Sequence, residues 1–271
     1  MNTYSFSPND MIAQGNTAEI YDLGEEKILK LFRDGIAPVA IEREYENTRI
    51  AARKLPEVPA AYDLFEKDGR SGIVFQKVGG ADMTKLMLSH PIKLKEYMKS
   101  FAAYHAKITT PVADDMRTVA EKLRDEIGWE NDLSEDEKKQ VLEFLSHLPD
   151  GDCLCHFDFH PGNVMVSDNG VFFLDWMTAC KGNACADAAR TYLLLRNGEP
   201  MGVPFLQLML IRASMHRGSR IYLREYCRLT GIKKKQVMRW MLPVAAARLS
   251  EWLTESERKK LVDFVRRKLK K

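Results

Sequence analysis

Residues 156–176 read HFDFHPGNVMVSDNGVFFLDW, and this stretch decides the fold. Two short apolar runs, VMV and VFFL, flank an Asn-Gly pair at 169–170, the dipeptide most typical of a tight hairpin turn. Before them, His156, Asp158 and Asn163 stand at fixed intervals, and a Pro-Gly pair ahead of Asn163 interrupts both helix and strand. The stretch therefore predicts a loop of hydrogen-bonding side chains that leads directly into a β-hairpin.

The predicted hairpin brings two oxygen-bearing side chains together. With the turn centred on the Asn-Gly pair, Val164 lies opposite Asp175 and Asn163 opposite Trp176, so that Asn163 and Asp175 are neighbours at the open end. Opposed residues have Cβ atoms about 5 Å apart, and amide and carboxylate oxygens suit a Mg²⁺ ion. With Asp158 nearby, the arrangement suits phosphoryl transfer, in which a metal holds the nucleotide phosphates and a separate Asp orients the attacking hydroxyl.

These motifs resemble those of a known family. The pattern H-x-D-x-x-x-x-N, followed by an Asp at the end of a hairpin, resembles the catalytic loop and metal-binding Asp of the protein-kinase-like fold. The variant HFDFHPGN, with LDW after it, resembles the aminoglycoside phosphotransferase and choline kinase-like family, although that family usually has Gly where this chain has Phe157. The resemblance implies that Asp158 is the catalytic Asp, that Asn163 and Asp175 bind Mg²⁺, and that His156 organises the loop. The alternative is that His156 and Asp158 only cap and brace a loop.

A lysine and a glutamate stand at positions expected to face inward. In KILKLF, residues 27–32, strand alternation places Lys30 on the same face as two apolar side chains. The helix expected at 39–55 carries Glu44 on its apolar stripe, and a charge in such a place is costly unless it is paired. The family resemblance implies that Lys30 and Glu44 form the pair that holds the ATP phosphates. The alternative is an ordinary strand lysine whose charge reaches solvent.

Weaker signals complete the predicted site. The turn QGNTAE contains Gly15 as its one glycine and takes the place of a nucleotide-covering loop, although an ordinary hairpin turn explains it equally well. By analogy alone, Gln76 and Val78 supply backbone groups to the adenine. Asp187 precedes the helical run AARTYLLLRNG and is expected to be its N-cap. The resemblance implies that Asp187 also braces the catalytic loop.

The order of the expected elements predicts an α+β chain with a two-lobed, protein-kinase-like fold. Alternating apolar patterns up to about residue 80 indicate a small antiparallel sheet with one inserted helix, and helical patterns dominate afterwards. We therefore expect a nucleotide-binding lobe at 1–80 and a mostly helical catalytic and substrate-binding lobe at 81–271, with the boundary near KVGGAD. The cofactors implied by the resemblance are ATP, or GTP, and Mg²⁺. The implied acceptor is a hydroxyl of a small molecule.

Charge along the chain is strongly segregated. Residues 201–271 contain 18 Lys and Arg against 5 Asp and Glu, whereas residues 110–152 contain 5 against 13. An acidic substrate-facing region would favour a cationic acceptor such as an aminoglycoside or a choline-like amine, although Glu and Lys also mix here as on a solvated helix face. The basic end lacks interleaved aromatic residues, so we expect no nucleic-acid partner.

The remaining composition points to a compact protein of the reducing cytoplasm. No apolar run approaches the ~20 residues needed to span a bilayer, and the start MNTYSFSPND does not resemble a signal peptide. The five cysteines form no C-x-x-C pair, which suits free thiols. We therefore expect a cytoplasmic enzyme without a membrane contact, present as a monomer or weak dimer.

Overall fold

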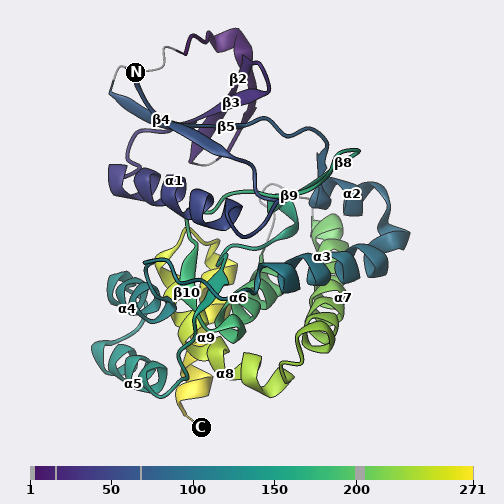
Figure 1. The fold of residues 1–271 in the computed structure, drawn as a ribbon. Coiled ribbons are helices and arrows are strands. Elements are labelled where there is room, and N and C mark those ends of the chain that lie inside the picture. The colour runs from purple at the N-terminus through teal and green to yellow at the C-terminus, as the bar shows by residue number, and fades with distance from the viewer. Residues whose placement is uncertain (1–3, 16, 68, 199–204, 271) are drawn as a thin grey trace. The chain divides into compact units, whose positions relative to one another are not determined.

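The computed structural model describes residues 4–15, 17–67, 69–198 and 205–270. The chain divides into two compact units, one formed by Met1–Leu86 with Pro161–Ala179 and the other by Met87–His160 with Cys180–Lys271. Figure 1 shows the strands and helices of both units along the chain. None of the described helices has the length and apolar character needed to cross a bilayer.

The first unit is built on a five-stranded sheet with the strand order β1-β2-β3-β5-β4, and every neighbouring pair is antiparallel. The predicted strands are confirmed. After a short 3-10 helix (Pro8–Asp10), their bounds are β1 (Met11–Gln14), β2 (Ala18–Gly24), β3 (Lys27–Phe32), β4 (Ala61–Lys67) and β5 (Arg70–Gln76). Alternation along β3 gives the sheet two apolar faces, because Phe32 and Leu31 belong to separate core clusters.

Helix α1 (Pro38–Ala52) covers the face of the sheet to which Phe32 belongs (Figure 1). Pro38 occupies its first turn, where a missing N–H costs nothing. Ile41 packs with Phe32 in one core cluster. The inward stripe predicted for this helix is confirmed, because Glu44 is buried together with the apolar residues around it. The helix therefore carries a carboxylate into the core beside the sheet.

The predicted hairpin is present, but its register differs from the prediction by one residue on each strand. Strand β8 (Val164–Ser167) pairs with β9 (Gly170–Phe173), so that Val164 lies opposite Phe173 rather than Asp175. The turn forms one residue earlier because the Ser167 hydroxyl accepts from Asn169 N at 3.2 Å and donates to Gly170 O at 3.2 Å. Gly170 alone in this turn takes a positive φ, 126°.

The hairpin belongs to the same compact unit as the sheet. Strand β6 (Ala81–Asp82) pairs with β8, and helix α2 (Met83–Ser89) follows it. Gly80 adopts a φ of 108°, and a Cβ atom on it would lie 2.2 Å from Val166 O. The sequence analysis expected two lobes, each continuous in the chain, with a boundary near residue 80. The first compact unit instead runs to Leu86 and also includes Pro161–Ala179. The reason is that the segment around Gly80 lies directly against β8.

The second unit is mostly helical. A short helix (Pro91–Lys93) precedes α3, and Arg248–Ser250 forms another after α8. The longer helices are α3 (Leu94–Ile108), α4 (Val119–Trp129), α5 (Glu135–Ser146), α6 (Ala184–Asn197), α7 (Phe205–Thr230), α8 (Lys234–Ala247) and α9 (Glu255–Leu269). Capping boxes at Ser134 and Thr254 start α5 and α9. Strands β7 (Cys153–Cys155) and β10 (Cys180–Gly182) form a two-stranded antiparallel sheet, and β7 leads into His156.

Candidate active site

In the first unit, one lysine meets two carboxylates. Strand β3 carries Lys30, whose Nζ lies 2.6 Å from Oε1 of Glu44 on α1 and 3.3 Å from Oδ1 of Asp175. Burial alone would lower the pKa of Lys30, but the charges of Asp175 and Glu44 outweigh it and raise the pKa. Lys30 is therefore held as an ammonium group, and it links the sheet, the helix and the residue after the hairpin.

Glu44 is the most buried member of this group, with 1% of its surface exposed. Its second oxygen, Oε2, has no hydrogen-bond partner in the part of the chain that the structure describes. Burial raises the pKa of Glu44 to about 7, a rise that the charge of Lys30 opposes and that of Asp175 reinforces. A carboxylate at this depth is expensive, so its place here indicates that it serves to hold Lys30.

A cavity of about 370 Å³ opens beside this ion pair within the first unit. Its volume falls within the range of small-ligand sites. Apolar side chains from the sheet and the hairpin form its walls, and Lys30, Glu44 and Asp175 form a polar part. The predicted residues Gly15, Gln76, Val78 and Asn163 line it as well. The cavity therefore combines an apolar wall with the ammonium group of Lys30.

Asn163 and Asp175 reach the same cavity in spite of the changed register. Asn163 O accepts from Leu174 N at 2.9 Å, which closes the hairpin one residue before Asp175. Asp175 then takes a left-handed backbone with a φ of 64°, which leaves the strand alternation. Their amide and carboxylate oxygens fit Mg²⁺, which usually takes one or two carboxylates together with substrate phosphates.

The segment after Asp175 is fixed by a residue that the sequence reasoning missed. Asn47, which is buried on α1, donates from Nδ2 to Trp176 O at 3.1 Å and to Ala179 O at 3.0 Å. Trp176 is itself 1% exposed and donates from Nε1 to Phe173 O at 3.0 Å. The available signal was the position of Asn47, three residues after Glu44 and therefore near it on one helix face.

In the second unit, helix α6 holds the loop that begins at His156 through the loop's backbone. Asp187 accepts from His156 N at 2.8 Å and from Phe157 N at 2.9 Å, and His105 Nε2 lies 3.0 Å from it. Burial raises the pKa of Asp187, but the neighbouring His105 and His156 and the Phe157 N–H outweigh it, so the pKa is lowered. Asp187 is thus an acceptor for the loop.

The expected N-cap role of Asp187 is wrong. Helix α6 begins at Ala184, and its N-cap is Asn183, whose side chain accepts from Cys185 N at 2.9 Å. Asp187 lies in the first turn, and its carboxylate points to the loop instead. His156 is fully buried, and its Nδ1 accepts from Asp158 N at 3.3 Å. This contact shapes the backbone that carries Asp158.

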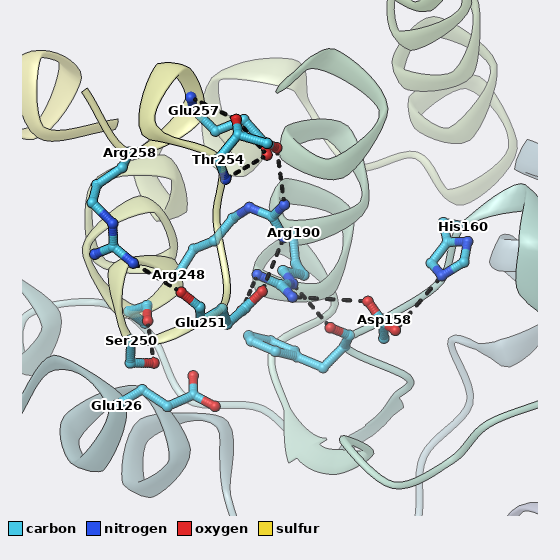
Figure 2. Close-up of polar contacts among 12 residues, drawn as sticks. Glu126, Asp158, His160, Arg190, Arg248, Ser250, Glu251, Thr254, Glu257 and Arg258 are labelled. Carbon is cyan, nitrogen blue, oxygen red and sulfur yellow. Dashed lines mark hydrogen bonds and ion pairs between the residues drawn. The ribbon is translucent and has the colours of Figure 1, made fainter. Parts of the chain in front are cut away.

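Around Asp158 the structure gathers further charges from α6 and from the chain that leads into α9 (Figure 2). Asp158 Oδ1 lies 3.8 Å from Nη2 of Arg190, and Asp158 Oδ2 lies 3.7 Å from Nε2 of His160. Nη1 of Arg190 in turn lies 2.6 Å from Oε1 of Glu251. The sequence reasoning included neither Arg190 nor Glu251. Arg190 had one signal, its place among the mostly apolar residues of α6, and Glu251 had none.

The chain is similar to known proteins in sequence pattern and in fold. Residues 11–217 match the family described as Phosphotransferase enzyme family, and no curated protein sequence matches the chain. A thermostable mutant of aminoglycoside phosphotransferase APH(4)-Ia, in ternary complex with AMP-PNP and hygromycin B, has a similar structure. Its TM-score is 0.59 at 16% identity, with 96% of this chain and 92% of that chain covered.

Two further solved structures are similar. ADP-bound aminoglycoside phosphotransferase APH(2'')-Ib has a TM-score of 0.57 at 13% identity, covering 94% of this chain and 90% of that one. A choline/ethanolamine kinase family protein from Mesorhizobium loti has a TM-score of 0.55 at 12% identity, covering 95% and 87%. The expected α+β, protein-kinase-like fold is confirmed. The match over residues 11–217 shows that the chain belongs to the phosphotransferase enzyme family, which the sequence motifs resembled.

Proposed function

We propose that this protein is a small-molecule kinase that transfers the γ-phosphate of ATP, or GTP, to a hydroxyl of a small acceptor. The observation that carries the proposal is the contact of Lys30 with the buried Glu44 and with Asp175, beside a cavity that Asn163 also lines. A buried ammonium that faces a ligand cavity favours an anionic ligand. Two of the solved structures named above contain AMP-PNP or ADP, which supports a nucleotide.

Each residue of the site has a role in the proposed reaction. Lys30, oriented by Glu44, neutralises charge on the nucleotide phosphates, and Gly15, Gln76 and Val78 line the nucleotide cavity. Asn163 and Asp175 hold Mg²⁺, which when bound neutralises charge that develops on the phosphates. Asp158 orients the acceptor hydroxyl and takes up its proton, while His156 and Asp187 fix the loop that carries it. Positioning and charge neutralisation supply most of the rate.

The proposed class of acceptor follows from the negative charge of one stretch of the second unit. Helices α4 and α5 lie within the acidic stretch at 110–152, which favours a cationic acceptor such as an aminoglycoside. A metabolic kinase for choline, ethanolamine, homoserine or a sugar uses the same phosphoryl-transfer residues, so these acceptors are tested together. We also propose that the protein acts in the cytoplasm as a monomer or weak dimer, without a nucleic-acid or membrane partner.

The first experiment asks whether the chain binds and consumes nucleotide. We expect ATP or GTP to raise the melting temperature only when Mg²⁺ is present, and ADP or GDP release to increase with one class of acceptor. The panel contains aminoglycosides, choline, ethanolamine, homoserine and simple sugars. A magnesium-dependent thermal shift without turnover on any acceptor would favour a catalytically silent nucleotide-binding protein. No shift with either nucleotide would contradict the proposal.

The second experiment concerns Asp158. The substitution Asp158→Asn keeps the shape of the side chain but removes its ability to take a proton. We expect turnover to fall by about 10²- to 10⁴-fold, while the magnesium-dependent thermal shift with ATP changes little. The control is Asp168→Asn in the exposed hairpin turn, which should leave turnover unchanged. Full turnover by Asp158→Asn would remove Asp158 from the reaction.

A further inference from the structure

Arg190 is a buried cation with three oxygen-bearing groups around it. It lies on α6 with 6% of its surface exposed. Its Nε donates to Phe157 O at 3.1 Å, its Nη1 lies 2.6 Å from Glu251 Oε1, and its Nη2 lies 3.8 Å from Asp158 Oδ1. Figure 2 shows the guanidinium between Glu251 and Asp158. One planar group therefore contacts the backbone of the catalytic loop and two carboxylates.

The two carboxylates are held differently. At 2.6 Å, Glu251 makes a short charge-assisted contact, whereas 3.8 Å is too long for a hydrogen bond to Asp158. The buried positive charge of Arg190 thus attracts Asp158. At this distance Arg190 Nη2 forms no hydrogen bond with Asp158 Oδ1. This matters for a carboxylate that is to accept a hydroxyl proton, since a bidentate arginine would cover both oxygens.

Glu251 is itself fixed by two further arginines. Arg248 Nη1 lies 3.0 Å from Glu251 Oε2, and Arg258 Nη2 donates to Glu251 O at 3.1 Å. Nη2 of Arg248 also lies 3.4 Å from Oε1 of Glu257, in the first turn of α9. Burial raises the pKa of Glu251, but Arg190 and Arg248 outweigh it and the pKa is lowered. Glu251 is therefore a fixed anion that competes with Asp158 for Arg190.

We propose that Arg190 is a positioning residue for Asp158 and that Glu251 sets the distance between them. This inference rests on the proposed function, because it concerns the residue proposed to orient the acceptor. Glu251 lies beyond residues 11–217, the part that matches the family. The C-terminal segment of this chain thereby acts on the catalytic loop through one guanidinium.

The test removes the competing anion without removing the cation. In Glu251→Gln the guanidinium loses its strongest partner and is expected to close on Asp158. We expect the kcat for magnesium-dependent ATP hydrolysis, with water as acceptor, to fall about 10- to 100-fold, with the KM for ATP within about twofold of the original. Arg190→Lys, which keeps the charge but loses the planar contacts, should retain more turnover than Arg190→Met.

Two controls separate this role from general destabilisation. Glu255→Gln removes an exposed charge four residues from Glu251, and Arg196→Met removes an exposed arginine from α6. Both should keep the original kcat. In the Asp158→Asn background, Glu251→Gln should cause no further loss, because it acts through Asp158. An equal loss in both backgrounds would assign Glu251 a purely structural role and overturn the inference.

A crystal structure of the Glu251→Gln protein gives a readout that needs no turnover. We expect the distance from Arg190 Nη2 to Asp158 Oδ1 to shorten from 3.8 Å to hydrogen-bond length. An unchanged guanidinium would overturn the inference even if the kinase reaction is real. If instead the guanidinium moves but the original protein and Asp158→Asn release ADP equally, the positioning contact stands and the proposed function fails.

Discussion

At the residue scale, the geometry of Lys30 and Glu44 follows from the high energy of a buried charge. Strand alternation turns Lys30 inward, and the helical stripe turns Glu44 inward, so each charge is costly without the other. The observed 2.6 Å contact offsets part of that cost, while burial still raises the pKa of Glu44. The sequence could predict this pair because both positions are set by local periodicity.

The raised pKa of Glu44 predicts a pH dependence of stability. Glu44 binds its proton more tightly in the folded chain, at a pKa of about 7, than in the unfolded chain, near 4.5. Its contribution is therefore fully present below pH 4.5 and is lost as the pH rises through about 7. Relative to Glu44→Gln, the original protein should lose about 3 kcal/mol of unfolding free energy across this range.

Urea unfolding at several pH values would measure this difference. Glu46→Gln on the same helix is the control, because the Glu46 side chain is 58% exposed. The unfolding free energy of this variant should follow that of the original protein at every pH. A difference between the original protein and Glu44→Gln that stays constant from pH 4.5 to 7 would mean that Glu44 does not titrate there.

At the scale of the element, helix α1 positions two parts of the site at once. Glu44 holds Lys30, and Asn47 holds the carbonyls of Trp176 and Ala179. The prediction for Asn47→Ala is a loss of about 1–3 kcal/mol in unfolding free energy, because buried carbonyls lose their donor. The magnesium-dependent thermal shift with ATP should also shrink, since Asp175 precedes this segment. Glu46→Ala is the matched control, and equal behaviour of the two variants would contradict the assignment.

The hairpin between β2 and β3 stores strain that a substitution can relieve. Glu25 and Glu26 adopt φ values of 49° and 59°, a conformation in which Asn and Gly are favoured. Glu25→Asn with Glu26→Gly should therefore raise the unfolding free energy by about 1 kcal/mol. Thermal and urea unfolding would show it. Glu25→Gln with Glu26→Gln removes the same charges but keeps the strain, so a similar gain in that variant would point to charge as the cause.

At the scale of the whole molecule, the first unit is assembled from two distant parts of the chain. Residues 1–86 alone lack the strand that pairs with β6 and the carbonyls that Asn47 contacts. They also lack Phe173, whose N–H donates to Glu57 O at 2.8 Å. We therefore expect the fragment 1–86 to show no cooperative thermal transition by circular dichroism.

Joining 161–179 to that fragment should restore cooperativity. A flexible linker of about ten residues, with a mean reach of roughly 18 Å, connects the two parts in one chain. A cooperative transition of residues 1–86 by themselves would show that the hairpin is dispensable for the first unit. The linked chain also offers a way to measure nucleotide binding without the second unit.

The predictable part of the fold and site is the part that local pattern controls. Strand alternation and helical stripes gave the sheet, α1 and the ion pair, because side-chain direction follows from spacing alone. The hairpin was predictable, but its register was not, since a contact of the Ser167 hydroxyl moved the turn by one residue. Asn163 and Asp175 still line one cavity, for a reason that spacing cannot express, namely the positive φ of Asp175.

By itself, the sequence determined the family, the order of most elements and the inward-facing pair of Lys30 and Glu44. Motif spacing and periodicity are properties of neighbouring residues, and they survive without knowledge of the fold. Only the tertiary structure decided that residues 161–179 complete the first unit, that Asn47 holds the segment after Asp175, and that Glu251 meets Arg190. Each of these depends on contacts between residues far apart in the chain, which packing fixes and local pattern does not record.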